Sequence, residues 1–478
     1  MSDVTDLFPM DRRQWLAVAL GAPLIRTAER RKTNVVFFMT DDQGAWASSA
    51  YGCRDLRTPN IQRLAEGGAR FTRAFSCTPV CSPSRMTYMT GQIPSQHGVQ
   101  DWLEPEDSYG SGSRRFLEGH TTYSEVLAHN CYTLGLCGKW HMGEDEKAQA
   151  GFTYWASVPG GGGTYRDPLF IKNGERFPYK GFKTDAVGDF AIEFLNKNYK
   201  RPFFLQVTFY APHTPYDYQP EMYRQWHNRS TFPCFPDLPM HPWQTAGTAK
   251  FHGSREAKHA YSALITGLDY NIGRIVTRLE ELGVRENTLI IFTADQGWNA
   301  GHHGVWGKGN GTIPFNMYEE SLCVPLIWNH PGRIRSGQVL TPMVSNYDFF
   351  PTILDYLGIG IPKDGVKRPG RSYAPFLRGE SPAWRNRLYF EYAYVRGVRT
   401  ETLKYVERSR EWPSELWDLE ADPGETRSVI GDPRYQKLLA ALRDEMRDFF
   451  RIHDAPPLDE WRLTTKQKMP EYRRFKEH

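Results

Sequence analysis

The sequence predicts an α/β fold in which a large, mostly parallel sheet is sandwiched by helices and followed by a smaller antiparallel sheet with a covering helix. Uninterrupted apolar runs, typical of strands buried on both faces, alternate with helical segments over most of the chain. Beyond residue 378 the pattern changes to short strand-like segments separated by turns. We therefore expect a main domain at residues 31–378 and a C-terminal subdomain at residues 379–478.

The same patterns place the individual elements. Strands are expected at residues 34–40, 70–75, 132–137, 203–210, 288–294 and 324–328, with helices at residues 59–66, 183–198, 258–282 and 348–357. Pro59 at the first helical position, after Thr58 as N-cap, marks the first helix start. Residues 159–181 are Gly-rich and are expected to form a long surface loop. The subdomain should contain short strands at residues 388–394, 397–399 and 403–406 and a final helix at residues 435–452.

The composition is that of an ordinary globular protein. A net charge of +4 lacks the basic excess of a nucleic-acid-binding protein, and no apolar run is long enough for a membrane helix. The seven cysteines are scattered. Cys131 and Cys137 are expected about 20 Å apart on one extended segment, too far for a bridge. No disulfide framework can be read from this spacing.

Residues 1–30 are predicted to be an export signal. Arg12 and Arg13 precede a short apolar segment and small residues, which resembles a bacterial twin-arginine signal. We therefore expect a periplasmic or extracellular protein. The alternative is a short amphipathic leader on a cytosolic protein.

The segment Cys-Ser-Pro-Ser-Arg at residues 81–85 indicates a reactive site. Pro83 fixes the backbone, and Arg85 carries a permanent positive charge. We expect a helix after Arg85 that ends near Gly91. Passage into this helix would leave Cys81 beside free backbone N–H groups, as in a reactive or modified side chain near an anion. The alternative is a buried structural cysteine beside a surface arginine.

Oxygen-bearing side chains follow two of the expected strands. Asp41 and Asp42 come directly after the first strand, and Asp295 and Gln296 directly after a later one. Ligands of α/β folds bind at the carboxyl ends of strands, so these groups should converge, although helix capping would also explain one acid. An all-oxygen set selects Ca²⁺ or Mg²⁺ over zinc. Six or seven ligands, counting a modified Cys81 and a substrate oxygen, favour Ca²⁺.

Cationic and imidazole side chains complete the candidate site, namely Arg85, Lys139, His141, His213 and Lys308. Lys139 and His141 are two apart in a segment that reads as extended, so their side chains should point to the same side. Together the five groups would surround a tetrahedral oxyanion. Taken alone, Lys139 and His141 are better explained as a solvated lysine and a packed histidine.

These blocks resemble the formylglycine-dependent, arylsulfatase-like sulfatases of the alkaline phosphatase superfamily. The resemblance covers about residues 33–430, and the matching blocks occur in the family's order: Asp41-Asp42, Cys81-Ser-Pro-Ser-Arg85 with Thr90-Gly91, Gly138-Lys139-Trp140-His141, Pro212-His213, Asp295-Gln296-Gly297, Lys308, and the Leu-Trp-Asp-Leu-Glu-Ala-Asp-Pro-Gly-Glu run from Leu416. Gln296 departs from the family, whose members often carry Asn or His there, and this bears on the metal geometry.

The resemblance implies an alkaline-phosphatase-like fold and a sulfuric ester hydrolase. A maturation enzyme would convert Cys81 to formylglycine, and its hydrate would attack the sulfur of a bound sulfate ester. The implied metal ligands are Asp41, Asp42, Asp295, Gln296 and the modified Cys81. The other implied roles are substrate binding by Lys139, His213, Lys308 and His303, leaving-group protonation by His213 and Lys308, proton removal by His141, and charge neutralisation by Arg85 and Lys139.

Other functions stay open at this point. A thiol-dependent phosphatase needs a longer loop than the three residues between Cys81 and Arg85. A phosphodiesterase or phosphonate monoester hydrolase of the same fold is a closer rival, although paired Lys139 and His141 favour sulfate. An inactive, carbohydrate-binding relative would lack catalytic groups, and none is missing. The Gly-, Trp- and Tyr-rich middle of the chain and the appended sheet favour a sulfated carbohydrate over an aryl or choline sulfate.

Overall fold

One large sheet organises the described residues, 31–409 and 412–458, of this computed structural model. Within that part of the chain the sheet has 11 strands in the order β10-β2-β9-β8-β1-β7-β3-β4-β5-β6, with β11 paired to β2. The strands are β1 (Asn34–Thr40), β2 (Ala69–Phe75), β3 (Thr133–Lys139), β4 (Tyr154–Val158), β5 (Leu169–Lys172), β6 (Glu175–Pro178), β7 (Phe203–Thr208), β8 (Thr288–Ala294), β9 (Cys323–Asn329), β10 (Gln338–Leu340) and β11 (Val344–Ser345). The predicted leader at residues 1–30 lies outside the described residues.

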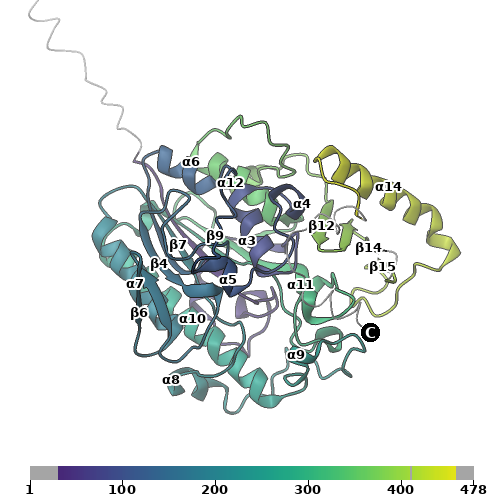
Figure 1. The fold of residues 1–478 in the computed structure, drawn as a ribbon, viewed down its shortest axis with the longest axis horizontal. Coiled ribbons are helices and arrows are strands. Elements are labelled where there is room, and N and C mark those ends of the chain that lie inside the picture. The colour runs from purple at the N-terminus through teal and green to yellow at the C-terminus, as the bar shows by residue number, and fades with distance from the viewer. Residues whose placement is uncertain (1–30, 410–411, 459–478) are drawn as a thin grey trace, which may run out of the picture. The chain divides into compact units, whose positions relative to one another are not determined.

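Helices cover both faces of this sheet (Figure 1), as predicted. The longer ones are α2 (Pro59–Glu66), α3 (Cys81–Thr90), α6 (Tyr123–His129), α7 (Lys183–Asn198), α10 (Arg255–Glu281) and α12 (Phe349–Leu357). The short ones are α4 (Pro94–His97), α5 (Pro105–Ser108), α8 (Glu221–Arg224), α9 (Ala246–Ala249), α11 (Glu319–Leu322) and α13 (Ala374–Leu377).

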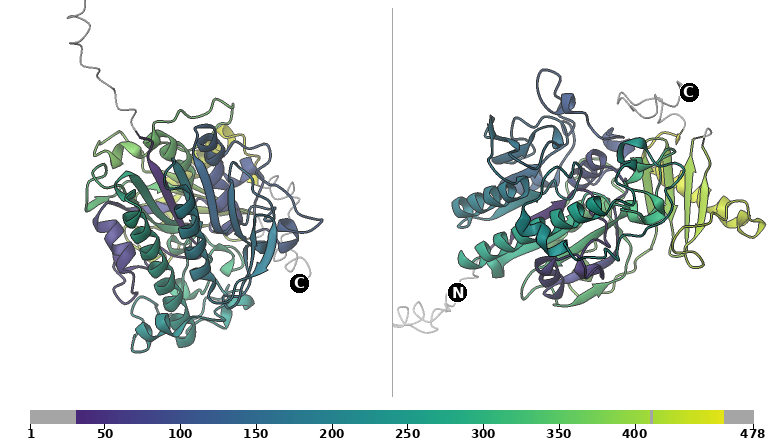
Figure 2. Two further views of the ribbon diagram at one scale, coloured as in Figure 1. Left: turned by 90° about the vertical axis from the view of Figure 1, so that its left-hand side faces the viewer. Right: turned by 90° about the horizontal axis from the view of Figure 1, so that it is seen from below.

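The central strand β1 shows why the sheet has a hydrophobic core on each of its two faces. Val36 and Phe38 pack with α2, α7 and α10, whereas Val35 and Phe37 pack with α3, α6 and α12. Side chains alternate across a strand, so an uninterrupted apolar run feeds both cores at once. Figure 2 shows α7 and α10 running side by side on one face. Strand β1 is parallel to its neighbours β7 and β8, and β9 runs antiparallel to both β8 and β2.

Two local predictions were wrong. Residues 159–181 are not a structureless loop, because β5 and β6 form an antiparallel hairpin at the sheet edge. The turn is Asn173-Gly174, both with positive φ, which is a strong hairpin signal. Helix α3 also begins earlier than expected, at Cys81 itself. Pro83 is tolerated in its first turn, where a backbone N–H has no helical partner to lose.

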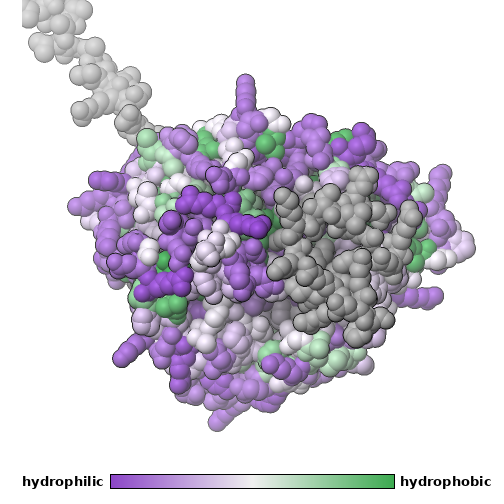
Figure 3. All heavy atoms as spheres, viewed as in Figure 1, coloured by the Kyte–Doolittle hydropathy of each residue, from purple (hydrophilic) through white to green (hydrophobic). Residues whose placement is uncertain are grey.

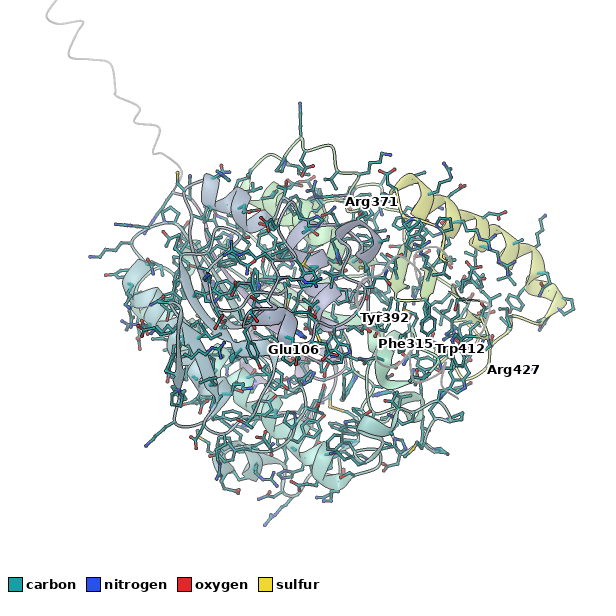
Figure 4. The ribbon with its side chains drawn as sticks, viewed as in Figure 1. Glu106, Phe315, Arg371, Tyr392, Trp412 and Arg427 are labelled. Atoms are coloured by element: carbon teal, nitrogen blue, oxygen red, sulfur yellow. A yellow bond between two sulfur atoms is a disulfide. The ribbon has the colours of Figure 1, made fainter. Side chains whose placement is uncertain are left out.

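The C-terminal part forms the predicted antiparallel sheet, here with strands β12 (Leu388–Tyr392), β13 (Val395–Arg399), β14 (Leu403–Arg408) and β15 (Glu415–Asp418). Helix α14 (Gln436–Ile452) packs on it, with the rings of Tyr389 and Phe449 stacked at 3.7 Å. Figure 4 labels Phe315 and Tyr392, whose rings stack at 4.7 Å and join this sheet to the preceding chain. The boundary expected at residue 378 stays a prediction.

A disulfide joins Cys53 to Cys234 across 181 residues of sequence. Cys131 and Cys137 are both free, in agreement with the expectation that they do not bridge. The surface seen in Figure 3 is largely hydrophilic, with scattered hydrophobic residues. In the part of the chain that the structure describes, every helix is too short or too polar to cross a membrane.

Candidate functional site

Three carboxylates meet at the ends of the two central parallel strands. Thr40 of β1 is in register with Ala294 of β8, so Asp41 and Asp295, the next residues along, leave the sheet at the same level. Both side chains are fully buried, and Asp42 is 1% exposed. Asp42 adopts a left-handed backbone conformation with φ of 64°, which turns the chain sharply at the strand end.

The side-chain amide of Gln296 bridges the carboxylates of Asp41 and Asp42, which follow β1. Its Nε2 donates to Asp41 Oδ1 at 3.1 Å and to Asp42 Oδ1 at 2.7 Å. Gln296 Oε1 and Asp42 Oδ2 are buried without a hydrogen-bond partner among the described residues. Two orphaned hard oxygen atoms in a cluster of buried carboxylates fit a divalent cation of the Ca²⁺ or Mg²⁺ type.

Helix α3 brings Cys81 and Arg85 to these carboxylates. Cys81 is its first residue, and Arg85 lies one turn later on the same face. Arg85 Nε donates to Asp295 Oδ2 at 2.8 Å, and its Nη1 donates to the Lys139 carbonyl at 2.8 Å. Ligand atoms of Asp41, Cys81 and Asp295 all lie within 4.8 Å of one another. The helix start therefore joins the carboxylate cluster.

Two lysines offset the negative charge of the buried carboxylates. Lys139, at the end of β3, donates to Asp41 Oδ2 at 2.5 Å. Lys308 Nζ lies 2.7 Å from Asp42 Oδ1 and 3.4 Å from Cys81 Sγ. Both lysine side chains are nearly inaccessible to solvent. They present fixed positive charge to anything bound at Cys81.

The histidines His141 and His213 line the same pocket as Cys81. His213 Nε2 lies 3.6 Å from Asp42 Oδ2. His141 Nε2 lies 3.0 Å from the Leu103 carbonyl oxygen. His141 has a positive φ of 58°, so the segment after β3 is not extended as predicted, although Lys139 and His141 still reach one pocket.

The charges of this cluster shift one another's ionisation. Burial would raise the pKa of Asp41, but Lys139 and the other nearby cations hold it well below its usual value. Burial and the charge of Asp41 raise the pKa of Asp295 to about 7. Burial opposes protonation of Lys308, yet Asp42 and its other anionic neighbours raise its pKa well above the usual value. Burial lowers the pKa of His141 and of His213, which favours neutral imidazoles.

The pocket above this cluster has a volume of about 440 Å³, a size suited to a small organic ligand. Its wall contains aromatic rings, glycine backbone and small residues that sequence reasoning missed: Trp102, Leu103, Gly160, Gly161, Gly162, Tyr210, Thr245, Ala246, Gly247, Thr248 and Trp298. They come from connecting segments and the short helix α9, which carry no catalytic motif, so only the Gly-, Trp- and Tyr-rich composition of the middle of the chain hinted at some of them.

His303 is the predicted site residue that the structure keeps apart. It does not line the pocket. Its Nε2 contacts Glu320 Oε2 at 2.5 Å, and its ring stacks on Tyr318 with centroids 4.0 Å apart. The ring is therefore engaged in packing and an ion pair, five residues along the chain from Lys308.

Family models match most of the chain. A model described as sulfatase matches residues 33–359, and one described as N-sulphoglucosamine sulphohydrolase, C-terminal, matches residues 301–451. The first match spans the strand ends, Cys81 and Lys308, and the second spans the C-terminal sheet.

Individual proteins agree with these models. The chain is 28% identical to an N-acetylglucosamine-6-O-sulfatase of Bacteroides thetaiotaomicron, over 89% of this chain and 88% of that one. It is 26% identical to an ulvan-active sulfatase of Formosa agariphila, over 89% and 86%. A structure solved in complex with its substrate D-glucosamine-2-N,6-O-disulfate superposes with a TM-score of 0.76 at 26% identity, covering 90% of this chain and all of that one. The family match includes the carboxylate cluster, Cys81 at the start of α3 and the lysines of the pocket. The chain therefore belongs to the sulfatase family and is a sulfuric ester hydrolase.

Proposed function

We propose that the protein hydrolyses a sulfate ester of a carbohydrate, using a formylglycine made from Cys81 and a bound divalent cation. The observation that carries the proposal is the position of Cys81. It lies at the first turn of α3, against Asp41 and Asp295 on one side and Lys308 on the other, and it lines a pocket of sugar size.

The carboxylate cluster supports a resident cation. Asp41, Asp42, Asp295, Gln296 and the modified Cys81 would hold it, and oxygen donors in this number favour Ca²⁺ over Mg²⁺. The cation would supply Lewis acidity, stabilising negative charge on an oxygen at Cys81 and on the sulfate. An amide flip of Gln296 would aim its orphaned oxygen at the carboxylate side of the site.

Cys81 as a plain thiol is a poor nucleophile here. Burial raises its pKa, so the reactive thiolate is disfavoured. A formylglycine hydrate supplies instead one hydroxyl for attack on sulfur and a second whose deprotonation allows sulfate to be expelled. Conversion needs a maturation enzyme that reaches the segment before it is buried.

The surrounding side chains take roles that follow from their positions. Arg85 and Lys139 tie Asp295 and Asp41 in place and offset their charge beside the reacting atom. Lys308 binds sulfate oxygens, and His213 helps it protonate the leaving oxygen. His141, neutral because burial lowers its pKa, accepts the proton of the second hydroxyl.

A carbohydrate leaving group is supported by the relatives and by the pocket wall. The bacterial relatives named above act on N-acetylglucosamine 6-O-sulfate or ulvan, or were solved with a sulfated glucosamine. Trp102 and Trp298 line the pocket beside glycine backbone and small polar residues, an arrangement that suits sugar rings. An aryl or choline sulfate, and a phosphonate monoester or phosphodiester, are the alternative substrates.

The sequence of residues 1–30 suggests export, and a disulfide and the name of one relative support it. The Cys53–Cys234 disulfide is typical of proteins that fold or function in an oxidising compartment. A relative from Drosophila melanogaster is named an extracellular sulfatase. Analysis of periplasmic and cytosolic fractions, before and after replacing Arg12 and Arg13 by lysine, tests the export signal.

Paired substrates test the reaction class. The processed enzyme is assayed with glucosamine 6-sulfate, 4-nitrophenyl sulfate, choline sulfate, a phosphate diester and a phosphonate monoester. We expect kcat/KM to be highest for the sugar sulfate. Phosphodiester or phosphonate turnover far above every sulfate ester would overturn the proposal, whereas a preference for 4-nitrophenyl or choline sulfate would overturn only its carbohydrate part.

A further inference from the structure

Gly161, within the four-glycine run Gly160–Gly163, packs closely against the His141 side chain. A Cβ atom built on Gly161 would lie 2.5 Å from Cγ and 2.5 Å from Cδ2 of the ring. Gly161 also has a φ of +64°, a conformation that L residues adopt at a cost. Only glycine therefore permits this contact, and the backbone at Gly161 forms one wall beside the imidazole ring.

Two buried polar side chains with no part in the proposed chemistry, Asp145 and Lys183, hold this glycine loop at both ends. Asp145 Oδ2 accepts the Gly160 N–H at 2.6 Å. Lys183 Nζ donates to the carbonyls of Gly162 and Gly163, each at 2.8 Å. Asp145 is fully buried and Lys183 is 1% exposed. Neither group can be exchanged for water without opening the core, so the loop is anchored rather than mobile.

The hydrogen bonds of His141 define which ring nitrogen carries the proton. Nε2 faces the Leu103 carbonyl at 3.0 Å, and a carbonyl can only accept. Nε2 is therefore the N–H, and Nδ1 carries the lone pair. Nδ1 is buried without a hydrogen-bond partner among the described residues, while His141 lines the pocket. One hydrogen bond alone would leave the ring free to tilt about that contact.

We propose that Asp145 and Lys183 are positioning residues that act through the Gly160–Gly163 loop to hold the His141 imidazole with Nδ1 ready to accept a proton from the pocket. This inference rests on the proposed function, in which His141 removes a proton. The loop blocks the ring face from one side, the Leu103 carbonyl fixes Nε2, and Nδ1 keeps a single orientation.

Histidine-ring NMR tests the positioning without catalysis. Protein with unprocessed Cys81 is labelled with ¹⁵N-histidine, and the His141 signals are assigned by their loss in His141→Gln. We expect the Nε2–H tautomer in the wild type. Gly161→Ala and Lys183→Met should average the tautomers or shift both ring nitrogens. Wild-type His141 signals in those two folded variants would overturn the inference.

Matched variants separate positioning from general damage. Asp145→Asn keeps an oxygen that can accept the Gly160 N–H and should preserve the His141 signals, whereas Asp145→Leu should not. Gly162→Ala should preserve the signals too, because its Cβ would meet nothing closer than 3.8 Å. Thermal melting identifies variants that unfold. If Asp145→Leu unfolds, the spectrum of Asp145→Asn is compared with that of the wild type instead. Equal spectra for Asp145→Asn and Asp145→Leu would count against a role for that carboxyl.

Kinetics of the processed enzyme give the second readout. Gly161→Ala and Lys183→Met should lower kcat by about 100-fold with little change in KM, because the base is misplaced while the sulfate site is intact. The exposed Lys180→Met is the charge-matched control and should keep wild-type rates. A rise in KM at constant kcat would contradict positioning of His141. A wild type that hydrolyses no sulfate ester would remove the proposed function and leave the NMR result to stand by itself.

Discussion

The Nζ atom of Lys308 lies 3.4 Å from the sulfur of Cys81. Lys308 is 5% exposed and its ammonium also contacts Asp42, so it cannot turn to solvent. An oxygen that replaces this sulfur would develop negative charge directly beside a fixed cation. The relationship explains why a modified side chain at this position would be activated, and it leads to the first prediction.

Mass analysis of the tryptic peptide Ala74–Arg85 tests the modification. In a host with a maturation enzyme we expect the CH₂SH of Cys81 to be replaced by CHO, with Cys77 in the same peptide unchanged as the internal control. Cys81→Ala should lower kcat/KM by at least about 1,000-fold, because the nucleophile is lost. Full activity with an unmodified thiol at Cys81 would contradict the proposed chemistry.

His213→Ala should distinguish substrates by their leaving groups. Protonation of the leaving oxygen matters little for 4-nitrophenolate, which departs as an anion, but matters for a sugar alkoxide. We expect the variant to lose about 100-fold to 10,000-fold in kcat/KM on a sugar sulfate and much less on 4-nitrophenyl sulfate. Equal losses on the two substrates would assign His213 to sulfate binding alone.

Removal of the cation should abolish activity without unfolding the protein. Lys139 and Lys308 already pair with the buried carboxylates, so the cluster keeps its charge balance. After chelation, Ca²⁺ should restore activity better than Mg²⁺ and raise the melting temperature, with about 2.7 kcal/mol gained at 100-fold excess over Kd. Asp42→Ala should show no such rise, whereas Asp444→Asn, at an exposed position, should behave as wild type. A Ca²⁺ response retained in Asp42→Ala would place the ion elsewhere.

Acid should weaken the packing of the 302–320 segment. Burial would raise the pKa of Glu320, but its hydrogen bond to His303 and the nearby imidazole charges lower it to about 2. A carboxyl whose folded pKa lies below its unfolded value of about 4.3 stabilises the fold above about pH 4.3 and loses that contribution as pH falls towards the folded pKa. We expect Glu320→Gln to flatten the dependence of the melting temperature on pH in this window. The exposed Glu118→Gln controls for net charge, and an unchanged slope in Glu320→Gln would refute the assignment.

The disulfide should contribute measurably to stability. Linking residues 181 apart in sequence removes much chain entropy from the unfolded state. The double variant Cys53→Ser, Cys234→Ser should lower the free energy of unfolding by about 2–5 kcal/mol in denaturant titrations. Cys131→Ser, which removes an exposed free thiol, is the control. Identical midpoints for the double variant and the wild type would show that the bridge does not form.

Much of the fold could be predicted because its signals are local. The apolar run of β1 and the N-terminal Pro59 of α2 are readable from a few neighbouring residues. The hairpin β5–β6 was missed although Asn173-Gly174 signals it, because the strands are short and the Gly-rich context suggested a loop.

In the candidate site, too, some residues could be predicted from the sequence and others could not. Asp41 and Asp295 were predicted together because parallel strands end at one edge of a sheet, and register alone then brings them to one level. His303 was implied by the family resemblance alone, and its stacking on Tyr318 and contact with Glu320 depend on how its segment packs against the start of α11. No spacing rule describes such packing.

The main strands and helices, the Cys81–Arg85 segment and the acidic strand ends can be read from the sequence alone, because each is encoded by residues adjacent in the chain. The Cys53–Cys234 bridge, the aromatic pocket wall and the contact of Gly161 with His141 emerge only in the folded protein. These features join residues far apart in sequence, and their geometry depends on packing that all the intervening segments establish together.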